Sequence, residues 1–233
     1  TNIAPHNLRE VCDATVRRRR RPDLGGDDLM LDDPGSGRLG IKGPDFPTAG
    51  SIHGVAGIKE AFHTGRGRIV MRARTEIEPI PHKADREQIV VRELPYMVNK
   101  AELIKKIAQL VRDKKLEGIS DLRDESDREG MRMVIELKRD AMPQIVLNQL
   151  FQQTFLQSTF GANNLAIVDG QPKLLDLKRI LECFISHRRE VVTRRTRFQI
   201  GQARAQREII EGLGMATTEI DAVVRTIRES KDV

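Results

Sequence analysis

A stripe of apolar residues repeats every seven positions over the last quarter of the chain. Its members are Leu177, Phe184, Val191, Phe198 and Ala205, and the neighbouring positions Leu181, Ile185, Val192 and Ile209 widen it. Neither a proline nor a turn dipeptide interrupts the stretch, and Asp176 is well placed to cap the first turn. The pattern predicts one helix from Asp176 to Leu213, roughly 55 Å long at 1.5 Å per residue. A helix of that length is a strut or one arm of a coiled coil.

The second heptad position of this stripe is polar in the middle of the helix. Arg188, Arg195 and Gln202 stand there in place of the leucine of a tight zipper. This predicts a loosely packed seam or a short partner. The same region carries a cationic run from His187 to Arg197 that contains a single acid. Such a run is either a solvated face of the helix or a surface that meets a polyanion.

Residues 65–78 alternate strictly between inward and outward positions, as a half-buried strand requires. The inward set is Ile69, Met71, Ala73, Thr75 and Ile77. On the outward side, Arg68, Arg72 and Arg74 point the same way, with neighbouring outward positions about 7 Å apart. This spacing suits a phosphate backbone, and the alternative interpretation is a solvated sheet face.

The rest of the chain alternates helical and extended patterns. Helices are predicted at 8–16, 56–63, 100–111 and 143–154, strands at 88–94 and 131–138, and a hairpin at 165–175 around Asp169-Gly170. A further helix is expected to start at Thr217 or Thr218. Together these elements predict an α+β fold, in which helices cover one face of a largely antiparallel sheet in two layers. The long coiled-coil-type helix follows this part.

Two polar stretches have structural interpretations. Five arginines, Arg17–Arg21, precede a proline and a segment rich in Gly, Pro and Asp, so residues 17–42 are predicted to form an exposed irregular loop. The five acids of residues 120–130 lack the spacing of a calcium-binding loop. They indicate a salt-bridged loop rather than a metal site.

Composition narrows the class of partner. The 233 residues include 40 Lys and Arg against 34 acids, which gives a net charge of +6 and predicts an acidic partner. Aromatic residues are only 3%, which disfavours a single-strand binder that stacks bases. No apolar run approaches the ~18 residues of a membrane span and no signal peptide is seen, so we expect a cytoplasmic protein without a membrane partner. Cys12 and Cys183 indicate neither a disulfide nor a zinc site. The initial Thr1 suggests a piece of a longer protein.

Several runs resemble the A subunits of the bacterial type IIA topoisomerases, DNA gyrase and topoisomerase IV. They are TNIAPHNL at 1–8, GPDFPTAG at 43–50, TGRGRIVMRAR at 64–74, LPYMVNKAELI at 94–104, EGISDLRDESDREGMRMVIELKRDA at 117–141 and HRREVVTRRT at 187–196. Together they cover most of the chain outside 17–42. The forms VNKA and EGISDLRDESD are more similar to gyrase than to topoisomerase IV.

The resemblance implies three segments. Residues 1–46 would follow a DNA-cleaving winged-helix domain that is absent here, 47–175 would form the α+β tower domain, and 176–233 would form the coiled-coil arm and the start of the exit-gate helices. By the same resemblance, Ile3 wedges between base pairs and helps to bend DNA. From the residues alone it is interpreted as a hydrophobic staple. The implied DNA contacts are Asn2, His6 and Asn7 near the wedge, and Arg66, Arg68, Arg72, Arg74 and Lys100 on the DNA backbone.

In this family a tyrosine hydroxyl attacks a phosphodiester. The motif that carries this tyrosine precedes the TNI segment, so we expect no catalytic residue in this chain, and Tyr96 is interpreted as a packing residue. The chain alone is expected to be inactive in cleavage and to bind no metal or other cofactor, with Mg2+ and ATP held by the partner gyrase B subunit. The implied assembly is an A2B2 heterotetramer on double-stranded DNA, built on a homodimer of A subunits, with the whole complex associated with the nucleoid.

Two features depart from the family pattern. Ala4 stands where the family motif has proline, and residues 17–42 replace an apolar helix end and a second short helix. Two alternatives remain open. The first is topoisomerase IV, which decatenates DNA, whereas gyrase introduces negative supercoils with ATP. The second is a non-enzymatic basic coiled-coil adaptor that binds RNA or an acidic protein.

Overall fold

The computed structural model describes residues 2–81 and 85–230, so residue 1 and residues 231–233 of the terminal segments named above lie outside the described part. The chain forms two compact units, Thr1–Glu182 and Cys183–Val233. The described strands and two hydrophobic cores belong to the first unit, and the second unit is helical. The predicted α+β class is confirmed. The segment boundaries expected near residues 46 and 175 stay predictions.

Helix α1 (Leu8–Arg20) begins at the predicted cap and ends later than predicted. The Asn7 side chain accepts hydrogen bonds from the backbone N–H groups of Arg9 and Glu10, at 3.0 and 3.4 Å. The arginine run continues the helix, because arginine is a good helix former. A second short helix, α2 (Gly26–Met30), follows it.

The prediction of an exposed irregular loop at 17–42 is wrong. Arg17 and Arg18 are buried, because their guanidinium groups donate to carbonyl oxygens of the chain that follows α1. Leu29 and Ile41 are fully buried in the core of this region. The segment is therefore a packed part of the first unit.

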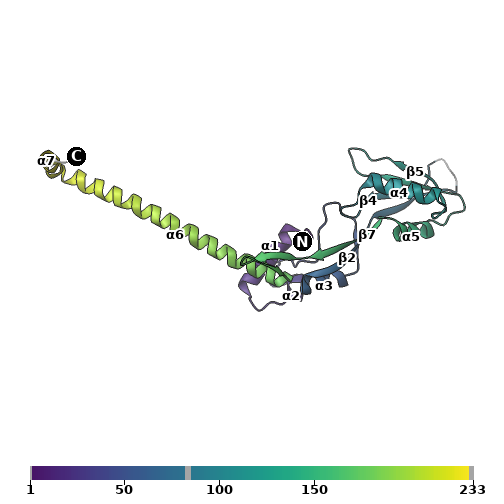
Figure 1. Ribbon diagram of the computed structural model, residues 1–233, viewed down its shortest axis with the longest axis horizontal. Helices are drawn as coiled ribbons and strands as arrows, with labels where there is room; N and C mark the ends of the chain where they lie inside the picture. Colours follow the sequence, from purple (N-terminus) through teal and green to yellow (C-terminus); the bar gives the residue numbers. More distant parts are fainter. Residues whose placement is uncertain (1, 82–84, 231–233) are drawn as a thin grey trace. The chain divides into compact units, whose positions relative to one another are not determined.

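The first sheet has the strand order β1-β2-β7 and is antiparallel throughout. Its strands are β1 (Ser51–His53), β2 (Arg66–Arg72) and β7 (Gln157–Asn163), of which only β2 is predicted from the sequence. Helix α3 (Ala56–Thr64) packs on one face of β2 and ends, as predicted, at Gly65, whose φ of 78° is left-handed. Figure 1 shows β2 and β7 side by side.

The strand predicted over 65–78 is divided at Ala73. The chain passes from β2 into β3 (Arg74–Pro79), which belongs to a second antiparallel sheet of order β3-β4-β6-β5. The other strands are β4 (Glu87–Glu93), β5 (Ile119–Asp124) and β6 (Met133–Leu137). Part of the predicted acidic loop is therefore strand β5. Helices α4 (Lys100–Arg112) and α5 (Pro143–Gln153) pack against this sheet and complete the second core (Figure 1).

The predicted hairpin at 165–175 is confirmed. Strands β8 (Leu165–Val168) and β9 (Gln171–Leu174) pair with each other as a two-stranded sheet. Asp169 and Gly170 form the turn, and their φ angles of 54° and 75° are those of a tight two-residue hairpin turn.

Helix α6 (Leu177–Thr218) confirms the long helix and continues past the predicted end. Asp176 caps it, because its carboxylate accepts a hydrogen bond from the backbone N–H of Arg179 at 2.6 Å. Leu177 and Leu181 are buried in a core of the first unit. Beyond them most of the apolar stripe is exposed.

A last helix, α7 (Ile220–Glu229), begins close to the start predicted at Thr217 or Thr218. In the described part of the chain, no helix combines the length and the apolar character that crossing a membrane requires.

Candidate nucleic-acid interface

The outward face of the first sheet is mostly polar. Directly paired residues of antiparallel strands share a face, so the register identifies the residues that lie on it. They are Ser51, His53, Arg66, Arg68, Val70, Arg72, Gln157, Thr159, Gly161 and Asn163. None of these described residues is acidic, and the alternate residues Ile69 and Met71 point into the core. The face thus combines cations with hydrogen-bonding side chains, as contact with a phosphate backbone requires.

Arg66 and Arg68 are the free cations of this face. Both are exposed, and neither forms an ion pair with another described residue. They lie two positions apart on one strand, so their side chains leave the sheet on the same side about 7 Å apart. Gly161 is opposite Arg68, and a Cβ atom placed on it would meet nothing within 4 Å. The surface beside Arg68 is therefore open to a ligand.

Arg72 lies on the same face, but internal contacts hold its guanidinium group. Its Nε donates to Oε1 of Gln157 at 2.6 Å, and its Cζ lies 4.9 Å from the centre of the Phe151 ring on α5. The side chain is half-buried. Arg72 thus ties β2 to its neighbours, and its contact with DNA stays a prediction.

The inclusion of Arg74 in one row with the arginines of β2 is wrong. Arg74 begins β3 in the second sheet and pairs with Glu93 at 3.3 Å. Lys100 also has an internal partner, because its Nζ lies 2.7 Å from a carboxylate oxygen of Asp124. That interaction, with a hydrogen bond from Ser126, lowers the pKa of Asp124 to about 2. The DNA contacts expected of Arg74 and Lys100 stay predictions, and both would have to leave these partners to make them.

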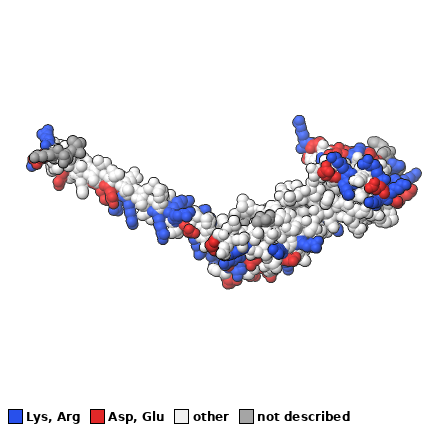
Figure 2. All heavy atoms as spheres, in the orientation of Figure 1, with Lys and Arg blue, Asp and Glu red and all other residues white. Residues whose placement is uncertain are grey.

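The outward face of the second sheet also carries arginines, but acids neutralise them. Each of three arginines forms ion pairs with two or three acids at distances of 3.3 Å or less. Arg92 pairs with Glu76 and Glu78, and Arg132 pairs with Glu78 and Glu125. Arg123 pairs with Asp121, Glu125 and Glu136. Figure 2 shows basic and acidic side chains intermingled around β5 and α4. The salt-bridged interpretation of residues 120–130 is confirmed. Of the two sheets, the first is therefore better suited to bind a polyanion.

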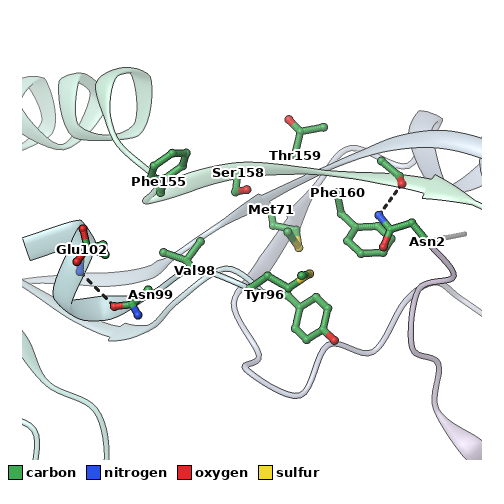
Figure 3. Close-up of a pocket in the computed structure, with 12 residues that line it drawn as sticks. Asn2, Met71, Tyr96, Val98, Asn99, Glu102, Phe155, Ser158, Thr159 and Phe160 are labelled. Atoms are coloured by element: carbon green, nitrogen blue, oxygen red, sulfur yellow. Dashed lines mark hydrogen bonds between the residues drawn. The ribbon is translucent and has the colours of Figure 1, made fainter. Parts of the chain in front are cut away.

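Ile3 is held at the open edge of β7. Asn2 and Asn163 exchange two backbone hydrogen bonds, at 3.0 and 2.9 Å. The Asn2 side chain also donates to the Gly161 carbonyl oxygen at 2.8 Å (Figure 3). Ile3 is 52% exposed, whereas Ala4 after it is buried. An apolar side chain is therefore presented to solvent at the edge of the basic sheet, on a backbone that three hydrogen bonds fix.

His6 and Asn7 fix the other end of this segment. His6 forms a β-bridge with Pro44, and its ring centre lies 5.5 Å from that of Phe62. Burial lowers the pKa of His6, so its ring is neutral near pH 7 and offers no cation to a phosphate. Asn7 caps α1 and donates to a carboxylate oxygen of Asp45 at 3.3 Å. Both side chains have internal roles, and their contacts with DNA stay predictions.

Tyr96 packs in an aromatic cluster, as predicted. Its ring lies 5.3 Å from that of Phe46, nearly parallel to it, and 6.2 Å from that of Phe160. Tyr96 and Phe160 border a pocket of about 340 Å³ between β7 and the start of α4, which Asn2 and Met71 also line (Figure 3). Among the described residues, no three His, Cys, Asp or Glu side chains gather as a metal site would require.

Comparison with known proteins identifies the family. The family profile for the A subunit of DNA gyrase/topoisomerase IV matches residues 1–233. The chain is 54% identical over 230 residues to the DNA gyrase A subunit of Pseudomonas aeruginosa, and 50% identical over 230 residues to that of Escherichia coli. Each match covers 99% of this chain but only 24% and 25%, respectively, of the relative. The chain thus spans about a quarter of the length of these curated relatives.

These matches place the chain among the subunits of DNA topoisomerases. More narrowly, the chain belongs to the family formed by the A subunits of DNA gyrase and topoisomerase IV. The family resemblance found in the sequence is confirmed over nearly the whole chain.

Proposed function

We propose that this chain is the DNA-binding and DNA-bending tower, with the coiled-coil arm, of a DNA gyrase A subunit. The whole enzyme would be an ATP-dependent type IIA topoisomerase that cleaves, passes and religates duplex DNA to introduce negative supercoils. The observation that carries the proposal is the acid-free sheet face with free Arg66 and Arg68, and with Ile3 at its edge. Identity of about half to relatives named as DNA gyrase A subunits supports it.

The sheet face would hold the sugar-phosphate backbone without reading bases. Arg66 and Arg68 would each neutralise one phosphate, which makes binding independent of sequence and sensitive to salt. Ile3 would enter a base step beside this contact and unstack it. The cost of unstacking, a few kcal/mol per step, is recovered when the bent DNA meets more protein. Rigid support matters here, because a wedge on a mobile backbone would yield before the DNA bends.

The chemistry of cleavage would come from elsewhere in the enzyme. Tyr96 is packed against two aromatic rings and does not lie on the basic face, so we assign it no catalytic role. We assign no cofactor to this chain, and we assign Mg2+ and ATP to the partner B subunit. The assembly would be an A2B2 heterotetramer in the cytoplasm, associated with the nucleoid.

The proposal is tested by Ile3→Ala in a heterotetramer assembled from full-length A and B subunits. Bending is measured by energy transfer between the labelled ends of a short DNA duplex. We expect bending and supercoiling to fall by more than duplex affinity. Leu8→Ala is the matched control, since Leu8 is also exposed, at 76%, but lies on α1. Normal bending by the Ile3 variant would refute the wedge.

The same preparation distinguishes gyrase from topoisomerase IV. Gyrase introduces negative supercoils into relaxed circular DNA with ATP, whereas strong decatenation without supercoiling would assign the chain to topoisomerase IV. An assembly that binds DNA without cleaving it would instead support a non-enzymatic adaptor.

A further inference from the structure

His53 is a titratable residue on the outward face of the first sheet to which the proposed function assigns no role. It is exposed and pairs with Val70 of β2, while Ser51 on its own strand pairs with Arg72. In this register His53 is diagonal to both Arg68 and Arg72, whose Cα atoms are then about 7–8 Å away. Long side chains meet over that distance, so a ligand held by Arg68 lies within reach of the imidazole ring.

The ring of His53 has a hydrogen-bond partner on its own strand. Its Nε2 lies 3.3 Å from Oγ of Ser51, and the Ser51 hydroxyl donates to the backbone carbonyl oxygen of Arg72 at 3.4 Å. Because the single hydroxyl proton goes to that carbonyl, Oγ accepts the hydrogen bond from the Nε2–H group. Within the described part of the chain, Nδ1 has no hydrogen-bond partner. Nδ1 is therefore the nitrogen that can take up a proton.

The surroundings of the ring favour its neutral form in the free protein. Desolvation of the ring, followed by the positive charge of Arg72, lowers the pKa of His53 below its usual 6.5. Glu93 lies beyond the start of β1, where its carboxylate accepts from the backbone N–H of Gly50 at 2.8 Å and pairs with Arg74 at 3.3 Å. Among its described residues, β7 adds no titratable side chain to this face, and α3 packs on the core side of β2.

We infer that His53 is a third cation of this face, which becomes charged by taking up a proton when a phosphate of duplex DNA binds beside Arg68. A phosphate oxygen near the ring stabilises the imidazolium form, and the new Nδ1–H group donates to that oxygen. The proton comes from the solvent. Arginines are charged at every working pH, so only the histidine makes this contact depend on pH. The inference rests on the proposed binding of DNA by this face.

The inference predicts that binding tightens as the pH falls. The phosphate raises the pKa of the bound histidine above its value in the free protein, so protons and DNA bind together. If the pKa rises by about one unit, affinity should be roughly tenfold higher at pH 6 than at pH 8. The dependence on salt should also be steeper at pH 6, because one more phosphate is neutralised on each face and each contact adds about 0.9 to the slope.

The test measures duplex binding across a salt series at pH 6 and pH 8. It uses the heterotetramer of full-length A and B subunits, without Mg2+ or ATP, so that binding is measured without cleavage. His53→Gln should keep the slope seen at pH 8 and lose the increase at pH 6. His53→Arg should show the steeper slope at both pH values, which a purely structural role of His53 would not produce. An increase at pH 6 that survives in His53→Gln would overturn the inference, as would equal slopes for the two variants.

Two further variants locate the effect. His63→Gln is the matched control, because His63 is also exposed but lies on α3, 3.1 Å from a carboxylate oxygen of Asp27. This control should keep the full dependence on pH, and its loss there would overturn the inference. R66A/R68A separates the inference from the proposed function. If R66A/R68A reduces the slope but His53→Gln leaves the pH dependence intact, DNA binds this face without His53. If neither variant changes the slope at either pH, the face does not bind DNA, and the proposed binding surface fails together with the inference.

Discussion

Arg18 on α1 forms an ion pair with Glu182 on α6, although 164 residues separate them in the sequence. The Arg18 side chain is 6% exposed and that of Glu182 30% exposed. The same guanidinium group donates to the backbone carbonyl oxygens of Pro22 and Leu24. One side chain therefore joins the first helix, the chain that follows it and the base of the long helix.

Glu182→Ala should destabilise the first unit, because it leaves the buried Arg18 charge without its anion. We expect a loss of about 2 kcal/mol, below the 3–5 kcal/mol of a fully buried pair because Glu182 is partly solvated. Urea unfolding measures it. Glu208→Ala on the exposed part of the same helix is the control and should change little. The hydrogen bond from Arg18 lowers the pKa of Glu182 below 4.5, so this difference should be complete above pH 4.5 and shrink as the pH falls.

Arg66→Ala with Arg68→Ala should weaken DNA binding and reduce its dependence on salt. Each lost phosphate contact removes about one counterion, so the slope of log K against log salt should decrease by about 2. Binding is measured across a salt series on duplexes of two unrelated sequences. The control, Arg92→Ala with Arg132→Ala, removes the same charge from residues that are internally paired. Equal slopes for both double variants would show that the basic face of the first sheet is not the binding surface.

Gly57→Ala should unfold more easily, although alanine is the better helix former by about 1 kcal/mol. A Cβ atom on Gly57 would lie 1.9 Å from the backbone carbonyl oxygen of Arg68, so α3 could not approach β2. We expect a net destabilisation of about 2–3 kcal/mol, measured by urea unfolding. Gly201→Ala is the opposite case, because nothing lies within 4 Å of its Cβ position in α6. That variant should increase helicity in circular dichroism.

Asp124→Asn should lower stability at neutral pH but not in acid. Because the folded-state pKa of Asp124 is about 2 and the ordinary value is 3.8, the charged carboxylate stabilises the fold above pH 3.8. That contribution is lost as the pH falls from 3.8 towards 2. Thermal unfolding of both proteins across this range measures it. Asp23→Asn, at an exposed carboxylate without an ion pair among the described residues, is the control. If the Asp124→Asn variant were still less stable than the unmodified protein at pH 2, the loss of stability would come from packing and not from the charge.

Capping and turn residues, which act on their immediate neighbours, predict much of the fold. Asp176 and Asn7 cap the helices predicted for them, Gly65 ends α3, and Asp169-Gly170 forms the hairpin turn. In each case the signal and the structure lie within a few residues of each other. The long helix was equally clear, because a heptad repeat over five turns or more has few other interpretations.

The arginines predicted to share one face of the strand over 65–78 show what sequence periodicity cannot predict. Alternation continues through Ala73, so the sequence cannot reveal that the strand changes sheets there. The partners of the arginines are also remote, since Arg72 bonds to Gln157, 85 residues away. Such contacts between residues distant in sequence decide which arginine side chains remain free to bind a ligand. The sequence predicts only that these side chains project from the same side of the strand.

Two other parts of the structure differ from the sequence prediction, each for its own reason. Five consecutive arginines predict an exposed loop. Arg17 and Arg18 are nevertheless buried, because backbone carbonyl oxygens accept hydrogen bonds from both guanidinium groups and Glu182 forms an ion pair with Arg18. Strand β7 is not predicted because it contains Gly161, Ala162 and Asn163, three residue types that are depleted in strands. The only indication was the alternation of Phe160 and Ala162 with polar or small neighbours.

The bridge between Asn2 and Asn163 also constrains how this segment can vary. Only residues 3–6 lie between it and the Asn7 cap, and both ends are fixed. Successive side chains of an extended backbone face opposite sides, so inserting or deleting one residue here would turn the Ile3 side chain away from the side on which we propose that it meets DNA. A substitution at Ile3 would change only the size of the proposed wedge, whereas a change in the length of the segment would remove it. The number of residues in this segment, more than their identity, is therefore what natural variation should preserve.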